Sequence, residues 1–441
     1  MTPTPVLALG DIDLGDLAFW TRPLDEREGA FATLRAERPV SFHREPEPPP
    51  GIPQGPGFWA LTRHADVLEA SRSPDLFCSG RGSNIGDLTP ELNEFFGSMI
   101  NMDDPRHARL RGIVSRGFTP RMVRRLEDDV ARTAARIVDD VIDRGECDFV
   151  TDIAAALPLT IICNMMGIPE SQYRFVFDRT NVILGAGDPE YVPDQDNLVE
   201  AILTAGFELS ALVQDLGRHR TQHPTDDLTS ALVNTQVDGD RLTDQELGSF
   251  FVLLVVAGNE TTRNAISHGL LALDAHPEQR ALWAADFERV APTAVEEIVR
   301  WATPVIHFRR TATRDTEIGG QAIRAGEKVV LWYCSANRDE AVFDEPFRFD
   351  VRRDPNEHVG FGGPGPHFCL GAHLARREIT VMFRELFRRL PDLHPTGDPQ
   401  RLLSFFIHGV KHLPCAFTPG GARRGTARFV RGSNGADTEG P

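Results

Sequence analysis

The sequence predicts a mainly helical protein to which small β-sheets are attached, and two patterns carry this prediction. Between residues 120 and 233, apolar residues recur at the three- and four-residue spacing of helices that bury one face. Short runs rich in β-branched and aromatic residues, interrupted by Gly or Arg-Asp, lie between Val305 and Trp332 and again between Phe405 and Phe417. Helical segments outnumber strands, so we expect one large helical body.

Composition agrees with a globular protein of this kind. The chain has 441 residues with 41% hydrophobic and 25% charged residues, and its net charge of −17 argues against a nucleic-acid partner. Pro- and Gly-rich residues 45–57 form a surface loop and not a linker, because a strand-then-helix pattern follows at once over 58–67. We therefore expect a single domain over 11–420, followed by a disordered tail over 421–441.

Cysteine usage and hydropathy bear on location. The six cysteines form no C-x-x-C pair, which is typical of a reduced, cytoplasmic protein. The N-terminus has neither a positive segment nor a long apolar stretch, and the most apolar run, 250–258, is short of the roughly 20 residues that a bilayer requires. We expect no transmembrane anchor. The cysteines are Cys78, Cys147, Cys163, Cys334, Cys369 and Cys415.

A Gly-rich loop followed by an amphipathic helix surrounds one of these cysteines. The segment 359–378 reads VGFGGPGPHFCLGAHLARRE, and Cys369 stands where the helix begins. The free N–H groups and the dipole of a helix N-terminus favour a thiolate, which is a metal ligand. The alternative is a Gly-rich turn around a buried structural cysteine.

The longest helical pattern runs from Leu242 to Leu273 and contains a polar block. Thr243 and Glu246 predict a capping box, and a helix of this length spans about 45 Å. Its apolar middle is interrupted by AGNETT at 257–262. A buried carboxylate and hydroxyl are costly unless they are bonded, so the block indicates either a kinked helix with satisfied hydroxyls or a proton relay.

Two further groups of charged residues have the spacing of neighbours on a helix face. Glu297 and Arg300 are three residues apart, although such pairs usually lie on the surface and contribute little. His107 and Arg111 are four residues apart, and Arg310 follows later in the chain. These cations suit carboxylate groups of a ligand, or else they belong to a solvated basic helix.

Taken together and in this order, the four patterns resemble those of the cytochrome P450 superfamily. The cysteine loop reads F-G-G-x-G-x-H-x-C-x-G-x-x-L-A-R, and the polar block reads A-G-x-E-T-T. Phe361 lies eight residues before Cys369, one more than in the common superfamily loop; the longer spacing also occurs in the bacterial steroid and branched-lipid hydroxylases. The resemblance implies the triangular, mainly helical P450 fold with a long central helix.

The resemblance also implies a cofactor, heme b, and a role for each motif. Cys369 would be the proximal ligand of the haem iron, Gly365 and Gly371 would permit the loop, and Glu297 and Arg300 would form a buried ion pair beside the haem. Glu260 and Thr261 would deliver protons during reductive oxygen activation. The implied contacts of the haem propionates are His107, Arg111, Arg310 and His367, with Arg309 able to exchange roles with Arg310.

The implied activity is a monooxygenase that inserts one oxygen atom of O₂ into an unactivated C–H bond. Stretches such as 157–169 and 253–269 are similar to those of actinobacterial methyl-branched lipid ω-hydroxylases and cholesterol side-chain hydroxylases. This favours terminal hydroxylation of a methyl-branched lipid, an isoprenoid or a sterol side chain. Alternatives are a tailoring hydroxylase of a polyketide or terpenoid and a non-catalytic haem-binding sensor.

Partners and substrate contacts follow from the same resemblance. The chain has no flavin or nicotinamide motif, so a ferredoxin and its reductase would supply electrons, with Arg116, Arg376 and Arg377 as a local basic face. Six apolar residues are candidates for the substrate pocket, although each could equally belong to the core. They are Ile100, Val256, Ala257, Val305, Phe308 and Phe406.

Overall fold

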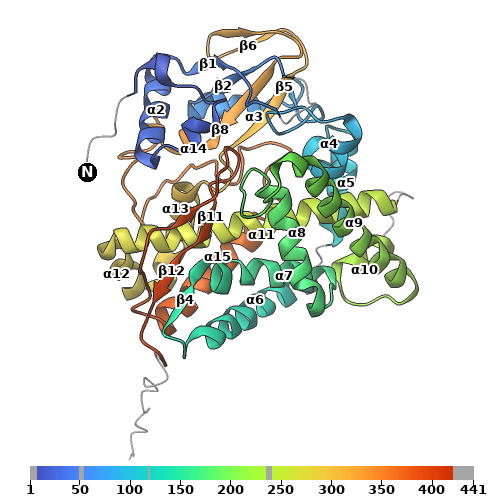
Figure 1. Ribbon diagram of the computed structural model, residues 1–441, viewed down its shortest axis with the longest axis vertical. Coiled ribbons are helices and arrows are strands. Elements are labelled where there is room, and N and C mark those ends of the chain that lie inside the picture. Colours follow the sequence, from blue (N-terminus) through green and yellow to red (C-terminus); the bar gives the residue numbers. More distant parts are fainter. Residues whose placement is uncertain (1–6, 49–53, 118–119, 235–240, 421–441) are drawn as a thin grey trace, which may run out of the picture.

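The computed structural model describes residues 7–48, 54–117, 120–234 and 241–420. It is mainly helical with small sheets, as the sequence predicts (Figure 1). The predicted tail, 421–441, lies outside the described residues.

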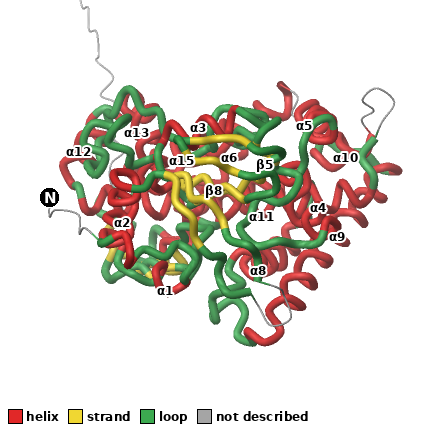
Figure 2. The backbone as a smooth tube through the Cα atoms, turned by 90° about the horizontal axis from the view of Figure 1, so that it is seen from above, coloured by secondary structure: helices red, strands yellow, loops and turns green. Residues whose placement is uncertain are grey.

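In the described residues, the β structure consists of one five-stranded sheet and three smaller sheets. The five-stranded sheet lies to one side of the helical body in Figure 1, and its strands are drawn in yellow in Figure 2. Its strands follow the order β1 (Val40–His43), β2 (Phe58–Leu61), β8 (Lys328–Trp332), β5 (His307–Ala312) and β3 (Phe77–Cys78), with only the β2 and β8 pair parallel. The smaller sheets pair β4 (Glu146–Asp148) with β12 (Pro414–Ala416) and β9 (His394–Pro395), β10 (Gln400–Arg401) with β11 (Val410–His412), and β6 (Thr316–Ile318) with β7 (Gln321–Ile323).

The helices follow the predicted apolar periodicity. The strand-then-helix prediction over 58–67 is confirmed by β2 and α3. The α-helices are α1 (Leu17–Trp20), α2 (Leu24–Glu37), α3 (His64–Arg72), α4 (Pro90–Gly97), α5 (Arg106–Gly117), α6 (Pro120–Val141), α7 (Ala156–Met166), α8 (Tyr173–Leu184), α9 (Leu198–Gln222), α10 (Leu228–Asn234), α11 (Asp244–Ala275), α12 (Pro277–Ala285), α13 (Phe287–Ala302), α14 (Tyr333–Ala336) and α15 (Ala372–Arg389). Shorter turns of helix are η1 (Leu9–Asp11), η2 (Ser98–Asn101), η3 (Phe149–Ala154), η4 (Glu170–Gln172) and η5 (Gln195–Asn197).

Helix α11 is the central element of the helical body. Thr243 and Glu246 form the predicted capping box, and the helix then runs unbroken for 32 residues across the molecule (Figure 1). It packs against α7, α9, α13 and α15. Most of its residues are buried, but Ala257 in the middle of the helix is exposed and Thr261, one turn later, is partly exposed. This strip faces space and not a neighbouring helix.

One segment is apolar and long enough to cross a membrane by length and composition alone. It is Phe149–Met166, which covers η3 and α7 and has a mean hydropathy of 1.7. Of this segment 67% is buried inside the protein, where α7 packs against α6 and α11. Its apolar character is therefore that of a core helix.

The side chains of Glu297 and Arg300 form an ion pair in the interior, and both are fully buried. Arg300 Nε and Nη2 each donate to one Glu297 oxygen, at 2.7 and 2.8 Å, and Nη1 donates to the carbonyls of Asn337 and Pro346, both at 2.9 Å. The pair therefore joins α13 to the segment that follows α14.

Glu297 also binds groups that the sequence analysis did not single out. It accepts hydrogen bonds from the Asp350 backbone N–H at 2.9 Å and from Asn356 Nδ2 at 3.1 Å, and it pairs with Arg353 at 3.2 Å. Two buried or nearly buried guanidinium groups thus share one carboxylate. These ion pairs and hydrogen bonds offset the free-energy cost of removing the three charged groups from water.

Replacing Glu297 with Gln keeps the shape of the side chain but leaves Arg300 and Arg353 without a counter-ion. We expect the free energy of unfolding to fall by about 3–5 kcal/mol, because stranded buried charges carry the full desolvation cost. Urea denaturation measures this. The control is Glu288→Gln on the same helix, where the carboxylate of an exposed pair with Arg384 is lost and about 1 kcal/mol or less is expected. Equal effects in the two variants would contradict the assignment.

Candidate active site

Cys369 lies immediately before α15. Its backbone N–H donates to the Phe361 carbonyl at 3.0 Å, and its sulfur accepts hydrogen bonds from the N–H groups of Gly371 and Ala372. The first helical residue is Ala372, so the thiol stands at a helix N-terminus, as predicted. Its side chain is solvent-exposed, and it is therefore accessible to a ligand.

The electrostatic setting of this thiol differs from the simple helix-dipole expectation. Although the Cys369 side chain is accessible, desolvation by the nearby protein raises its pKa, whereas the two N–H groups and the charges of Arg111 and Arg376 act in the opposite direction. The helix terminus alone therefore does not produce a thiolate here. A bound metal cation would, because coordination deprotonates a thiol.

The two glycines predicted to permit the loop have different surroundings. At Gly365, where φ is +150°, a Cβ would lie 2.4 Å from the Ser71 carbonyl oxygen, so this position requires glycine. At Gly371 a Cβ would meet no protein atom within 4 Å. Gly371 therefore borders open space beside the sulfur of Cys369.

Four cationic or potentially cationic side chains from distant parts of the chain meet near the cysteine loop. The rings of His107 and His367 lie 4.4 Å apart between centroids, and Arg111 donates to the Phe368 carbonyl at 2.7 Å. Burial, together with the nearby charges of Arg310, His107 and Arg111, lowers the pKa of His367 to about 3. The structure thus gathers the predicted carboxylate-binding set.

The neighbouring residues Arg309 and Arg310 have different partners. Arg309 forms an ion pair with Asp87 at 2.6 Å and donates to the Arg81 carbonyl at 3.0 Å. Arg310 donates to the Arg309 carbonyl at 2.8 Å, and no carboxylate among the described residues pairs with it. Arg310 is therefore the better candidate of the two for an anionic ligand.

The polar block of α11 places its acid and its alcohol in different surroundings. The Thr261 hydroxyl donates to the Ala257 carbonyl at 2.6 Å on the exposed strip of the helix. Glu260 is buried, where it forms an ion pair with Arg263 and accepts a hydrogen bond from Asn264 Nδ2 at 2.9 Å. Within the residues that the structure describes, no hydrogen bond joins Glu260 to Thr261.

Arg263 and Asn264 were missed by the sequence analysis. Arg263 Nη1 also donates to Asn181 on α8 at 3.1 Å, and Asn264 Oδ1 accepts from the Val410 N–H at 3.0 Å. The only signal in the sequence was that Arg263 lies three residues after Glu260, which places both on one helix face.

Comparison with known proteins agrees with this geometry. Residues 289–405 match the family model described as cytochrome P450. Over 95% of its length the chain is 55% identical to a methyl-branched lipid omega-hydroxylase of Mycobacterium bovis, 97% of which is covered, and 40% identical to a steroid C26-monooxygenase of Mycolicibacterium smegmatis, 96% of which is covered. The chain is a cytochrome P450. It is accordingly a monooxygenase.

The fold comparison agrees with this assignment. A crystallised cytochrome P450 of Mycobacterium marinum in complex with pseudoionone superposes with a TM-score of 0.88 at 46% identity, covering 95% of this chain and 100% of that one. The predicted P450 fold is therefore confirmed.

P450 enzymes carry a haem whose iron is held by a cysteine thiolate, and the residues of this site fit that group. The donor set combines one accessible thiol with four side chains suited to two carboxylates. Nε2 of His107 is buried and has no hydrogen-bond partner among the described residues. A Cβ on Gly371 would fill the open space beside the sulfur, where a flat group must approach.

The predicted substrate contacts are all incompletely buried, although Val256, Val305 and Phe308 also pack against the hydrophobic core. Phe308 and Phe406 contact each other edge to face, with ring centroids 5.6 Å apart, and the Ile306 N–H donates to the Phe406 carbonyl at 2.8 Å. Ala257 lies on the exposed strip of α11. The full set of partly buried or exposed candidates is Ile100, Val256, Ala257, Val305, Phe308 and Phe406.

One residue of the predicted basic face for a redox partner already has a carboxylate partner. Arg376 forms an ion pair with Glu296 at 2.5 Å and lies over the Phe361 ring, 4.3 Å from its centroid, so it braces the cysteine loop and is not free. Burial opposes ionisation of Glu296, but hydrogen bonds from His358 and Arg376 lower its pKa to about 2. Arg116 is exposed and Arg377 is partly buried.

A network of charges, also missed by the sequence analysis, holds the loop 185–197 between α8 and α9. Lys411 pairs with Asp188 at 3.0 Å and with Glu190 at 2.7 Å, and His412 bonds Glu190 at 2.8 Å and Asp148 at 2.5 Å. Asp188 also accepts from the N–H of Leu403. The loop is thereby tied to β11 and to the turn that leads to Phe406.

Titration of His412 is expected to weaken this network as the pH rises. Burial opposes its charge, but the hydrogen bonds to Asp148 and Glu190 prevail and raise its pKa. Because the pKa of His412 is higher in the folded state than in the unfolded state, protonated His412 stabilises the fold. This stabilisation is complete below the unfolded-state pKa of about 6.5 and is lost as the pH rises through the folded-state pKa. We expect the hydrogen-exchange protection of the backbone amides of residues 185–197 to fall between pH 6 and pH 8. The decrease should be no more than about fivefold, because His412 is one-third exposed and solvent weakens its ion pairs.

The matched variants are His412→Gln, which removes the charge, and His394→Gln at an exposed histidine. We expect the pH dependence of protection to vanish in the first and persist in the second. Persistence in both would exclude His412 as the titrating group.

Proposed function

We propose that this P450 hydroxylates the terminal carbon of a methyl-branched lipid, an isoprenoid or a sterol side chain. The observation that carries the proposal is that the incompletely buried candidate contacts are all apolar and that one of them, Ala257, lies on the exposed strip of α11, which suits an aliphatic substrate. The names of the two curated relatives, one acting on methyl-branched lipids and one on steroids, point the same way.

In this proposal heme b is held by Cys369 through its thiolate. The propionates are bound by the cations gathered beside the loop, which are His107, Arg111, Arg310 and His367. When bound, the haem supplies the reductive activation of O₂. Arg376, fixed by Glu296, adds a positive charge near the sulfur, and the N–H groups of Gly371 and Ala372 bond to it.

The protein's further contribution is proton delivery. The overall reaction, RH + O₂ + 2e⁻ + 2H⁺ → ROH + H₂O, consumes two protons. Thr261 presents its hydroxyl on the exposed strip, where it can accept a proton from one side and donate it on the other. Glu260 is held by Arg263 and Asn264. It serves as the buried acid that passes protons to the exposed strip after its side chain exchanges these partners for new ones.

We further propose a ferredoxin and ferredoxin reductase as the electron donors, a cytoplasmic location, and a single domain over 11–420. The exposed Arg116 is the one predicted docking residue that is fully accessible in the described part of the chain. The acid and alcohol of α11 argue against a non-catalytic haem sensor, which would need neither.

The function is tested by titrating the ferric holoenzyme with a methyl-branched fatty acid, cholest-4-en-3-one and an unrelated macrolide. We expect the lipid or the sterol to shift the Soret band from low spin to high spin and to be converted to the terminal alcohol with a ferredoxin pair. The control, Cys369→Ala, should lose the thiolate-type spectrum of the reduced carbon monoxide complex. A response to the macrolide alone would favour a tailoring hydroxylase.

Replacing Thr261 with Ala is expected to uncouple the reaction. Without the hydroxyl, product formation should fall at least about tenfold while most electrons end in hydrogen peroxide. Peroxide and product are measured per NADPH consumed. Thr262→Ala removes the neighbouring buried hydroxyl and should leave the coupling unchanged. Unaltered coupling in Thr261→Ala would require another proton route.

A further inference from the structure

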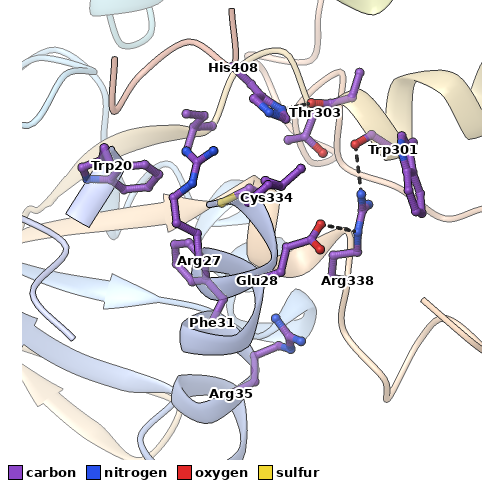
Figure 3. Close-up of a pocket in the computed structure, with 13 residues that line it drawn as sticks. Trp20, Arg27, Glu28, Phe31, Arg35, Trp301, Thr303, Cys334, Arg338 and His408 are labelled. Atoms are coloured by element: carbon purple, nitrogen blue, oxygen red, sulfur yellow. Dashed lines mark hydrogen bonds and ion pairs between the residues drawn. The ribbon is translucent and has the colours of Figure 1, made fainter. Parts of the chain in front are cut away.

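A small cavity with a mainly apolar lining lies apart from the candidate active site. It has a volume of about 40 Å³ and lies between α2, the end of α13 and the segments that carry Cys334 and His408 (Figure 3). None of the residues assigned above to haem, protons or substrate lines it. Its walls include the apolar side chains of Trp20 and Phe31, and three arginines also line it.

Two of these arginines are neutralised by partners. Arg35 binds Glu340 through Nε at 3.0 Å and through Nη2 at 2.8 Å. Arg338 pairs with Glu28 at 3.3 Å and donates to the Trp301 carbonyl at 3.0 Å, as Figure 3 shows. Glu28 is the single carboxylate among the lining residues.

Arg27, the third arginine, has no such partner. Its side chain rises from α2 past Cys334 (Figure 3), and the residue is only 9% exposed. No ion pair or side-chain hydrogen bond joins its guanidinium to any described residue, and its Nε is buried and unpartnered. An isolated buried charge is costly, and burial accordingly lowers the pKa of Arg27.

The neighbouring groups offset the charge of Arg27 only in part. The guanidinium lies over the Trp20 ring, 5.9 Å from its centroid, and the charge of Glu28 acts on it without forming an ion pair. Burial raises the pKa of the Cys334 thiol to about 12, so it stays neutral and can donate a weak hydrogen bond. His408 donates from Nδ1 to the Ala302 carbonyl at 2.7 Å, and burial keeps the ring neutral. Arg401 is near enough to lower the pKa of Arg27 and adds positive charge.

We propose that this cavity binds one small monovalent anion, of the size of chloride, as the counter-ion of Arg27. The Arg27 guanidinium and the Cys334 thiol are the donors that face it. A volume of about 40 Å³ corresponds to roughly three water molecules, which admits a halide and excludes a phosphate ester. The anion would link Arg27 on α2 to Cys334 on α14.

The direct test is a bromide soak of holoenzyme crystals with diffraction data collected at the bromine absorption edge. We expect an anomalous peak within hydrogen-bonding distance of the Arg27 guanidinium. Bromide peaks confined to the protein surface, with only water in the cavity, would overturn the proposal.

A solution test compares thermal unfolding in chloride and in gluconate at equal ionic strength. In the unmodified holoenzyme, chloride at one hundred times its Kd should raise the unfolding midpoint by roughly 3 °C. The midpoint should follow a saturable binding curve as the chloride concentration rises. Arg27→Gln should lose this increment, and Arg348→Gln, which removes an exposed arginine, should keep it. The same increment in all three proteins would overturn the proposal; if Arg27→Gln does not fold, the bromide experiment decides alone.

Discussion

The buried ion pair between Glu297 and Arg300 is the interaction on which the rest of the structure depends. Removing two charges from water is expensive, and here hydrogen bonds to every charged atom offset that cost. Arg300 binds the Asn337 carbonyl, and the Asn337 side chain in turn accepts a hydrogen bond from the Val359 N–H at 2.8 Å. The irregular segment between α14 and the cysteine loop is thereby positioned by a single pair of residues on α13.

Around this framework the two sides of the site differ in charge. On the side of Cys369, Arg111 and Arg310 form no ion pair with a described carboxylate, whereas His107 bonds Asp104 and Arg376 pairs with Glu296. The two unpaired arginines suit a ligand that brings its own negative charge. On the side of α11, the acid is already paired with Arg263, and only the Thr261 hydroxyl reaches the exposed strip. The two sides of the site therefore differ: unpaired arginines lie on the Cys369 side, and a paired carboxylate with one accessible hydroxyl lies on the α11 side.

The sequence predicted what depends on neighbouring residues. The fold class, the capping box of α11 and the strand and helix over 58–72 all follow from local periodicity and capping. The partners of buried charges were not predictable, because Arg353 reaches Glu297 across 56 residues and Arg376 reaches Glu296 across 80. Which of Arg309 and Arg310 is free likewise depends on Asp87, which is more than two hundred residues away in the chain.

The charge network that holds the loop 185–197 has a consequence for kinetics. His412 and Glu190 are partly open to solvent, whereas Asp188 is buried, so dissolved ions screen mainly the attraction between His412 and Glu190. This loop borders the turn that leads to Phe406, a wall of the candidate pocket. The rate at which an uncharged lipid enters would then depend on ionic strength, although the lipid itself has no charge on which salt can act.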